Sequence, residues 1–504
     1  MDKLEKQSLN TAENEINKSS FVFSILNIAI LAVSGFLVSF KLAFVITIGY
    51  IIIHFVLQTN YVKACIQKYK VYQKVKPYIK HAKSLNHSTT LIAKYIAGVP
   101  VKPNETEVDT FNDIKNHLGD SFPFMIKIKD TRNKLITVNN KQAKCISSYN
   151  YLDLGRDQSC QDAAIEAAKA YSTGNHGPRM LCGNLQILED LEAKIASFFN
   201  KEAALVMSSG YLACMSTIAG IAKKGDLLLM DKLSHASLKA GSKLCNAKTV
   251  TFKHNDFEDA EKQIKNNKFK NLIMVIEGVY SMDGDIGNLP VARKLCDKYN
   301  GLLILDEAHS LGTIGKTGRG TSEYFNYTAE ADIICGTFTK AISSVGGFLA
   351  CSKRLREYYT FYAPGAVFSA PLSAYHAGGA LRSFEIILEN PSIVTKLQEN
   401  TEYMINKFKE NNFNIGETVT CVIPVIFRDL NQLIEMHSYI LKKGYFAAAV
   451  MAPACPLDAP RFRICATSTY TKEEMDDIIN ILIEARSVTK ESSRVRELVE
   501  VMKK

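Results

Sequence analysis

Residues 302–312, LLILDEAHSLG, and residues 331–340, ADIICGTFTK, decide the fold predicted for this chain. Each stretch opens with a short apolar run of strand length and becomes polar where the run ends. Similar runs occur earlier, at residues 203–207, 226–230, 248–252 and 272–276. Stretches with helical spacing lie beside the runs, at residues 187–199, 256–267 and 289–299. Apolar strands alternating with helices predict an α/β fold with a mainly parallel sheet covered on both faces.

Polar residues gather directly after these runs, where the strands of a parallel sheet reach the same edge. Asp306 and His309 follow the run at 302–305. Lys340 follows the last run, and His235 follows an earlier one. Backbone and hydroxyl donors complete the set, namely Gly210, Tyr211, Thr337 and Thr339. We therefore expect one site that combines a lysine, a carboxylate and two imidazoles.

Pyridoxal phosphate (PLP) is a cofactor that this combination suits. A lysine amine forms a Schiff base with the PLP aldehyde, and Lys340 is the candidate. Asp306 can keep the pyridine nitrogen protonated, and His235 can cover the ring. The phosphate needs amides at a helix start together with hydroxyl groups, supplied here by Gly210, Tyr211, Thr337 and Thr339. The 12 cysteines include no pair at C-x-x-C spacing, so the sequence predicts no metal site.

Motifs between residues 147 and 488 resemble the α-oxoamine synthases, PLP enzymes of fold type I. They are NYL (150–152), GPRMLCGN (177–184), SSGYLA (208–213), SHAS (234–237), EGVYSMDGDIGNL (277–289), DEAHSLG (306–312), GTFTKA (336–341), VGGF (345–348) and RFRICATSTYT (461–471). The resemblance implies an enzyme that joins an amino acid to an acyl-CoA with loss of carbon dioxide.

Within this family, the sequence most resembles the serine palmitoyltransferases. GTFTK (336–340), EGVYSMDGDI (277–286) and FKHND (252–256) carry that likeness. It implies condensation of L-serine with palmitoyl-CoA to 3-ketosphinganine, the first step of sphingolipid synthesis. The alternatives are a glycine-using synthase that makes aminolevulinate or aminoketobutyrate, and a non-catalytic partner subunit.

The resemblance also implies roles for individual residues around the cofactor. Lys340 would hold PLP and later move a proton at the substrate α-carbon. Asp306 would pair with the pyridine nitrogen, and His309 would hydrogen-bond the ring oxygen. His235 would stack on the ring and position the substrate carboxylate.

Further residues would bind the substrate or join two subunits. Arg463 would bind the substrate carboxylate through its two parallel N–H donors. Asn150 and Tyr151, from the NYL motif, would contact the substrate. Ser369 matches a hydroxyl that reaches the phosphate of the neighbouring subunit. This match implies a homodimer or a heterodimer with a related subunit.

Three features depart from the family pattern. Leu188 and Tyr470 stand where histidine is common in the family. GPR at 177–179 is similar to the non-catalytic partner subunit of the eukaryotic enzyme, which lacks the lysine. Because Lys340 is present, we interpret the chain as catalytic.

These patterns divide the chain into seven segments. They are a polar tail (1–20), a hydrophobic membrane segment (21–59), a basic juxtamembrane helix and linker (60–115), an N-terminal arm (116–160), the PLP-binding large domain (161–389), a smaller C-terminal α+β domain (390–490) and a tail (491–504).

The segment 21–59 predicts attachment to a membrane. Residues 21–40 carry no charge, and residues 42–57 are almost as apolar, which is enough to cross a bilayer core. Residues 61–104 contain nine lysines and no acidic residue, whereas the whole chain has a net charge of +10. This lysine excess predicts a cytosolic body, and the resemblance implies the endoplasmic reticulum membrane. The remaining chain is nearly neutral, so we expect no nucleic-acid partner.

Overall fold

The computed structural model describes residues 123–489, apart from residues 125, 130, 132–134, 139–140, 452–453 and 457. The predicted segments 1–20, 21–59, 60–115 and 491–504 therefore lie outside the described residues. Within the described part, no helix is both long and apolar enough to cross a membrane. The membrane segment at 21–59 stays a prediction.

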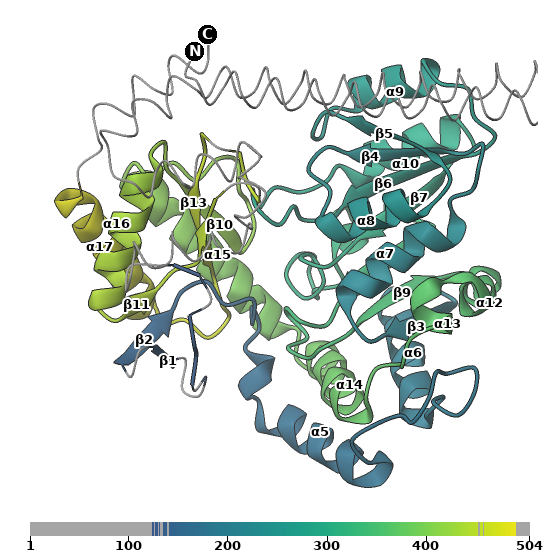
Figure 1. Cartoon of the computed structure of the whole chain (residues 1–504). Helices are drawn as coiled ribbons and strands as arrows, with labels where there is room; N and C mark the ends of the chain where they lie inside the picture. The colour runs from purple at the N-terminus through teal and green to yellow at the C-terminus, as the bar shows by residue number, and fades with distance from the viewer. Residues whose placement is uncertain are drawn as a thin grey trace, which may run out of the picture. The chain divides into compact units, whose positions relative to one another are not determined.

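A seven-stranded sheet forms the centre of the large domain (Figure 1). Its order is β3 (Ala203–Met207), β9 (Gly347–Cys351), β8 (Ile333–Thr337), β7 (Leu302–Asp306), β6 (Leu272–Glu277), β4 (Leu227–Asp231) and β5 (Lys248–Phe252). β9 is antiparallel to both neighbours, and the other neighbouring pairs are parallel. The mainly parallel α/β sheet is confirmed, and β9 is a strand that the sequence prediction omitted.

Both faces of this sheet are buried, because alternate residues of each strand enter different cores. In β3, Ala204 and Val206 join one core, and Leu205 and Met207 join the other. The first core includes α6 (Gln186–Phe198), α9 (Phe257–Lys265) and α10 (Leu289–Lys298). The second includes α7 (Gly210–Ile221) and α8 (Ala236–Leu244). Burial on two sides explains why the strands are apolar throughout.

Shorter elements and a long helix pair complete the large domain. They are η3 (Leu154–Arg156), α5 (Gln158–Tyr171), α11 (Thr321–Tyr324), α12 (Lys353–Tyr362), α13 (Pro364–Val367) and α14 (Ala374–Glu389). Helix α14 packs against α5 and α6.

The C-terminal domain combines helices with a small antiparallel sheet. Its strands are β10 (Val422–Ile426), β13 (Arg461–Cys465) and β12 (Ala449–Val450), with β13 in the middle. Its helices are α15 (Ser392–Glu410), α16 (Leu430–Lys442) and α17 (Lys472–Val488). Thr471 and Glu474 form a capping box that fixes the start of α17.

The N-terminal arm is built into this C-terminal domain (Figure 1). Strands β1 (Leu135–Val138) and β2 (Lys141–Cys145) form a hairpin, and β2 pairs in parallel with β11 (Tyr445–Phe446). Beyond β2, the carbonyl of Ile146 accepts the amide of Cys465 at 2.9 Å. The arm therefore runs beside the strand that carries Arg463. The domain boundaries drawn from the sequence remain predictions.

Candidate active site

Three polar residues lie side by side where β6, β7 and β8 approach their ends. Glu277 pairs with Asp306, and Asp306 pairs with Cys335. Residues paired in this way point to the same face of the sheet, which here is the face covered by α7. Cys214 of α7 donates its thiol to Oδ2 of Asp306 at 3.5 Å.

Asp306 is a buried carboxylate without an ion-pair partner among the described residues. It is 3% exposed, and its Oδ1 accepts the amide of Ala308 at 2.9 Å. Among the described residues, no lysine, arginine or histidine forms an ion pair with it, so a cationic group of a ligand suits this position.

The sulfurs of Cys214 and Cys335 and an Asp306 oxygen lie within 4.8 Å of one another. Three such ligand atoms also suit a metal ion, so the expected lack of a metal stays a prediction.

Lys340 follows β8 in a loop that brings its amine near this carboxylate. Burial lowers the pKa of Lys340 to about 8, the charge of Asp306 opposes the shift, and Arg463 adds to it. A lysine with a lowered pKa is neutral in a larger fraction of molecules near pH 7 to 8. The amine is therefore available as a nucleophile and as a base.

The start of α7 offers donors for a phosphate group. Ser209 caps the helix by accepting the amide of Leu212 at 3.1 Å, and the first amides of a helix have no partner within it. A Cβ at Gly210 would lie 2.3 Å from Cβ of Thr337, so only glycine allows this close packing. The hydroxyl groups of Thr337 and Thr339 lie 2.9 Å apart at the same corner. These residues fit a phosphate, as the sequence predicts.

His235 caps the start of α8 and has a defined tautomer. Its Nδ1 accepts the amide of Ser237 at 3.2 Å, so a neutral ring carries its proton on Nε2. Burial lowers the pKa of His235, although Asp306 opposes the shift. The backbone amide of His235 donates to the buried carboxyl group of Glu277. Burial and the charge of Asp306 raise the pKa of Glu277 well above its usual value.

A second buried cluster joins His309, Tyr151 and Arg463. The Tyr151 hydroxyl and Arg463 Nη2 lie 2.9 and 3.3 Å from Nδ1 of His309. Arginine only donates, so Nδ1 accepts and Nε2 holds the proton of the neutral ring. Burial, together with the charges of Lys340 and Arg463, holds the pKa of His309 well below its usual value. Nε2–H is then the donor available to a ligand oxygen.

Arg463 is 1% exposed and has only neutral partners among the described residues. Its Nε donates to the carbonyl of Ser281 at 2.6 Å, and its Nη2 donates to the Tyr151 hydroxyl at 3.2 Å. The guanidinium also lies over the ring of Tyr149, 4.2 Å from the ring centre. A buried positive charge without a carboxylate partner suits an anionic ligand.

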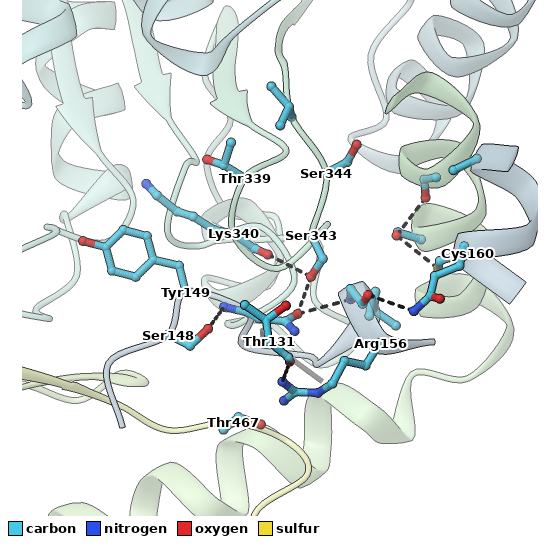
Figure 2. A pocket seen from close by; sticks show the side chains of 18 of the residues that line it. Thr131, Ser148, Tyr149, Arg156, Cys160, Thr339, Lys340, Ser343, Ser344 and Thr467 are labelled. Carbon is cyan, nitrogen blue, oxygen red and sulfur yellow. Dashed lines mark hydrogen bonds between the residues drawn. The ribbon is translucent and has the colours of Figure 1, made fainter. Parts of the chain in front are cut away.

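A cavity of about 650 Å³ opens beside Lys340 (Figure 2). Lys340 and Tyr149 extend toward the same side of it. The arm, the loop after β8, helix α14 and the C-terminal domain all contribute to its lining. Its volume lies within the range of about 300–1,000 Å³ that is usual for ligand sites.

The other predicted site residues lie at different distances from this centre. Asn150 lines the cavity, and its Oδ1 accepts the hydroxyl of Ser343. Tyr151 is fully buried and reaches the centre through His309. Ser369 does not line the cavity, and its hydroxyl donates to the carbonyl of Ala370 at 3.1 Å. Its expected contact with a neighbouring subunit stays a prediction.

The residues that depart from the family pattern lie in different parts of the large domain and the cavity. Leu188 is buried in the core and does not line the cavity, whereas Tyr470 does line it. The hydroxyl of Tyr470 donates to the carbonyl of Cys145 in the arm at 3.3 Å. Arg179, from the GPR sequence, pairs with the buried Glu192. Of these three side chains, only Tyr470 can act directly on a ligand in the cavity.

Comparisons with known proteins show the family of the chain. The family model described as aminotransferase class I and II matches residues 146–482. An 8-amino-7-oxononanoate synthase of Thermoanaerobacter pseudethanolicus is 35% identical over 67% of this chain and 86% of its own length. A serine palmitoyltransferase of Bacteriovorax stolpii is 33% identical over 73% of this chain and 89% of its own length. The chain belongs to the α-oxoamine synthase family.

Solved structures of α-oxoamine synthases show the same likeness. The serine palmitoyltransferase of Sphingomonas wittichii superimposes with a TM-score of 0.72 at 27% identity, covering 75% of this chain and 96% of that one. Another match, with a TM-score of 0.72, is described as SPT with PLP. PLP is therefore the cofactor of this chain, as the sequence predicts. The carboxylate of Asp306, the amine of Lys340 and the amides at the start of α7 suit its nitrogen, aldehyde and phosphate, respectively.

Several residues around the site were missed in the sequence prediction. Glu277 and Tyr149 belong to or adjoin the quoted motifs, but no role was assigned to them. Cys214 directly follows the SSGYLA motif, and Ser343 lies three residues after Lys340. Their position within or next to the motifs, together with their polar or aromatic side chains, could have indicated that they belong to the site.

Proposed function

We propose that this chain catalyses the decarboxylating condensation of L-serine with palmitoyl-CoA to 3-ketosphinganine. In this reaction, the serine α-carbon forms a bond to the thioester carbonyl carbon, CoA leaves as its thiol, and the serine carboxyl group leaves as carbon dioxide. PLP supplies an electron sink for the pair of electrons left on the α-carbon. Similarity to the serine palmitoyltransferases supports this choice of substrates.

The observation that carries the proposal is the buried, unbalanced charge of Arg463 beside His309. This guanidinium would bind the serine carboxylate, and His235 would help to orient it. The Lys340 amine would take the α-proton, for which a pKa of about 8 is well matched near neutral pH. Asp306 would keep the pyridine nitrogen protonated, and His309 would donate Nε2–H to the ring oxygen.

The same proposal places the enzyme on the endoplasmic reticulum membrane with its body in the cytosol. The apolar segment 21–59 and the lysines that follow it support this location. Both the acyl chain and the product are lipids, so attachment keeps the site near its substrate. We further propose a dimer, either of two copies or with a related subunit, in which Ser369 reaches the neighbouring phosphate. Detergent-free fractionation with full-length and 60–504 chains tests the attachment, because only the full-length chain should sediment with membranes.

The main competitor is another acyl-CoA condensation of the same class. The 8-amino-7-oxononanoate synthases are similarly close relatives, and their product carries a methyl group beside its amine, as condensation of alanine would give. Synthases that make aminolevulinate or aminoketobutyrate would use glycine instead. A non-catalytic partner subunit is disfavoured because Lys340 and Asp306 are both present.

Product analysis separates these possibilities. The purified chain, alone and with any co-purifying subunit, is given isotope-labelled serine, glycine and alanine with a mixture of short and long acyl-CoAs. We expect mass spectrometry to find labelled 3-ketosphinganine as the main product, and none with the Lys340→Ala variant. A main product from glycine or alanine would refute the choice of serine, and a preference for short acyl-CoAs would refute the choice of palmitoyl-CoA.

A further inference from the structure

His254, just beyond β5, lies between two carboxylates from neighbouring strand ends. Its Nδ1 is 3.0 Å from Oδ1 of Asp231, the last residue of β4. Its Nε2 is 2.8 Å from Oδ2 of Asp285, in the loop after β6. An ionised carboxylate only accepts hydrogen bonds, so both ring nitrogens donate and the imidazole is positively charged. Burial opposes this charge, but the two carboxylates raise the pKa of His254 to about 10.

The Asp231–His254–Asp285 cluster fastens three loops at the ligand-binding edge of the sheet. Asp231 is fully buried and also accepts the amides of Leu233 and Asn255, at 2.8 and 2.9 Å. The side-chain amide of Asn255 donates to Oδ2 of Asp285 at 2.8 Å. Each loop is thus bonded to the cluster by at least one buried or half-buried charge.

Two of these loops lead directly to groups of the site. The loop after β4 continues from Asp231 to His235. The loop after β6 carries Ser281, whose carbonyl accepts Nε of Arg463 at 2.6 Å. It also carries Asp283, which pairs with Arg461 at 2.8 Å. A shift of this loop would therefore move the arginine side chains of β13.

We propose that His254 is a positioning residue, whose imidazolium holds the loops bearing His235 and the Arg463-bound carbonyl in register for the substrate carboxylate. The inference rests on the proposed function for the nature of the ligand. His254 itself would touch neither substrate nor cofactor, since both of its ring nitrogens are already occupied by Asp231 and Asp285.

The test compares the PLP-loaded full-length chain with His254→Gln and Asp285→Asn. Asp332→Asn is the matched control, because it removes a 2.8 Å ion pair with Arg293 next to the opposite end of β8. Hydrogen exchange should become faster in both loops, at residues 231–238 and 279–287, in the two cluster variants only. The dissociation constant for L-serine, read from the absorbance of the bound cofactor, should rise about tenfold in them. The cofactor absorbance without serine should be retained.

Two results would overturn the inference. One is unchanged exchange in either loop of the His254→Gln variant. The other is faster exchange in both loops with the wild-type dissociation constant for serine, which would make the cluster merely structural. If serine leaves the absorbance of the wild-type chain unchanged, the proposed function fails. The exchange comparison then still decides whether His254 fastens the loops.

Discussion

Two arginine clusters in this chain differ in the hydrogen-bond partners of their guanidinium groups. Glu192, in α6, receives both Arg179 and Arg356, and it accepts the amide of Val206 at 2.8 Å. Arg463 has only neutral hydrogen-bond partners in the described part of the chain. In the first cluster each arginine has a carboxylate partner, whereas in the second Arg463 has none among the described residues and can bind an anionic ligand. The presence or absence of a carboxylate partner, rather than burial, distinguishes the scaffold from the candidate binding site.

The largest effect should follow removal of Lys340, the other cation of the unbalanced site. We expect Lys340→Ala to lower turnover by about 10³-fold or more, because it removes both the nucleophile and the base. The melting temperature should stay close to that of the wild type, since Lys340 belongs to neither hydrophobic core of the large domain. Product formation and thermal melting measure the two effects. Full activity in this variant would exclude Lys340 from the chemistry.

Arg463→Met would test the unbalanced side of the comparison directly. Loss of the guanidinium should weaken serine binding about 100-fold, because a charge-assisted pair of hydrogen bonds is lost. The free energy of unfolding should stay equal or increase, since an uncompensated buried charge disappears. Cofactor absorbance during serine titration and urea denaturation give the two values. Strong destabilisation with unchanged serine binding would reverse our assignment.

Arg179→Met should show the opposite behaviour. It removes two hydrogen bonds to the buried Glu192, which keeps Arg356, so we expect a loss of about 1.5–3 kcal/mol in the free energy of unfolding. The dissociation constant for serine should not change, since Arg179 pairs with Glu192 and not with a residue of the candidate site. Lys169→Met, which removes an exposed ion pair with Glu166, is the control and should not alter stability measurably. A selective loss of serine binding would instead connect the GPR sequence with catalysis.

A buried histidine that is neutral near pH 7 gives an effect that appears only at acidic pH. His437 in α16 is fully buried, and burial lowers its pKa to about 4. The unfolded chain binds a proton at His437 near pH 6.5 and the folded chain only near pH 4, so stability falls as the pH drops through this window. The loss from this residue is about 3 kcal/mol at most. His437→Leu should flatten the urea-midpoint profile between pH 6.5 and 4, and an unchanged slope would contradict this account.

The strands of the central sheet could be predicted because two buried faces make them apolar along their whole length. Strand β9 is equally apolar, but Gly346 and Gly347 at its start are typical of a turn, so the sequence did not predict a strand there. The two-residue strands β11 and β12 carry no periodicity at all, and only tertiary pairing defines them. The fold class was therefore accessible from the sequence, whereas its antiparallel strand and short pairings were not.

Site residues could be predicted from the sequence where they follow strands that neighbour each other in the sheet. Asp306, His309 and Lys340 could be grouped because they follow neighbouring parallel strands. Arg463 lies on a strand of the other domain, so only the family resemblance pointed to it. The contact of Tyr149 with Arg463 joins residues more than 300 positions apart, which no local pattern encodes.

Pairing of the arm with the C-terminal domain limits how far this protein can be shortened. Strand β2 supplies a neighbour for β11, and carbonyl groups after β2 accept the amides of Cys465, at the end of β13, and of Ser468, just beyond it. A chain that begins after residue 146 would expose the edge of β11 and leave the amide of Cys465 without its partner, the carbonyl of Ile146. Soluble fragments for crystallisation should therefore keep the hairpin from Leu135 onward, whatever is removed before it.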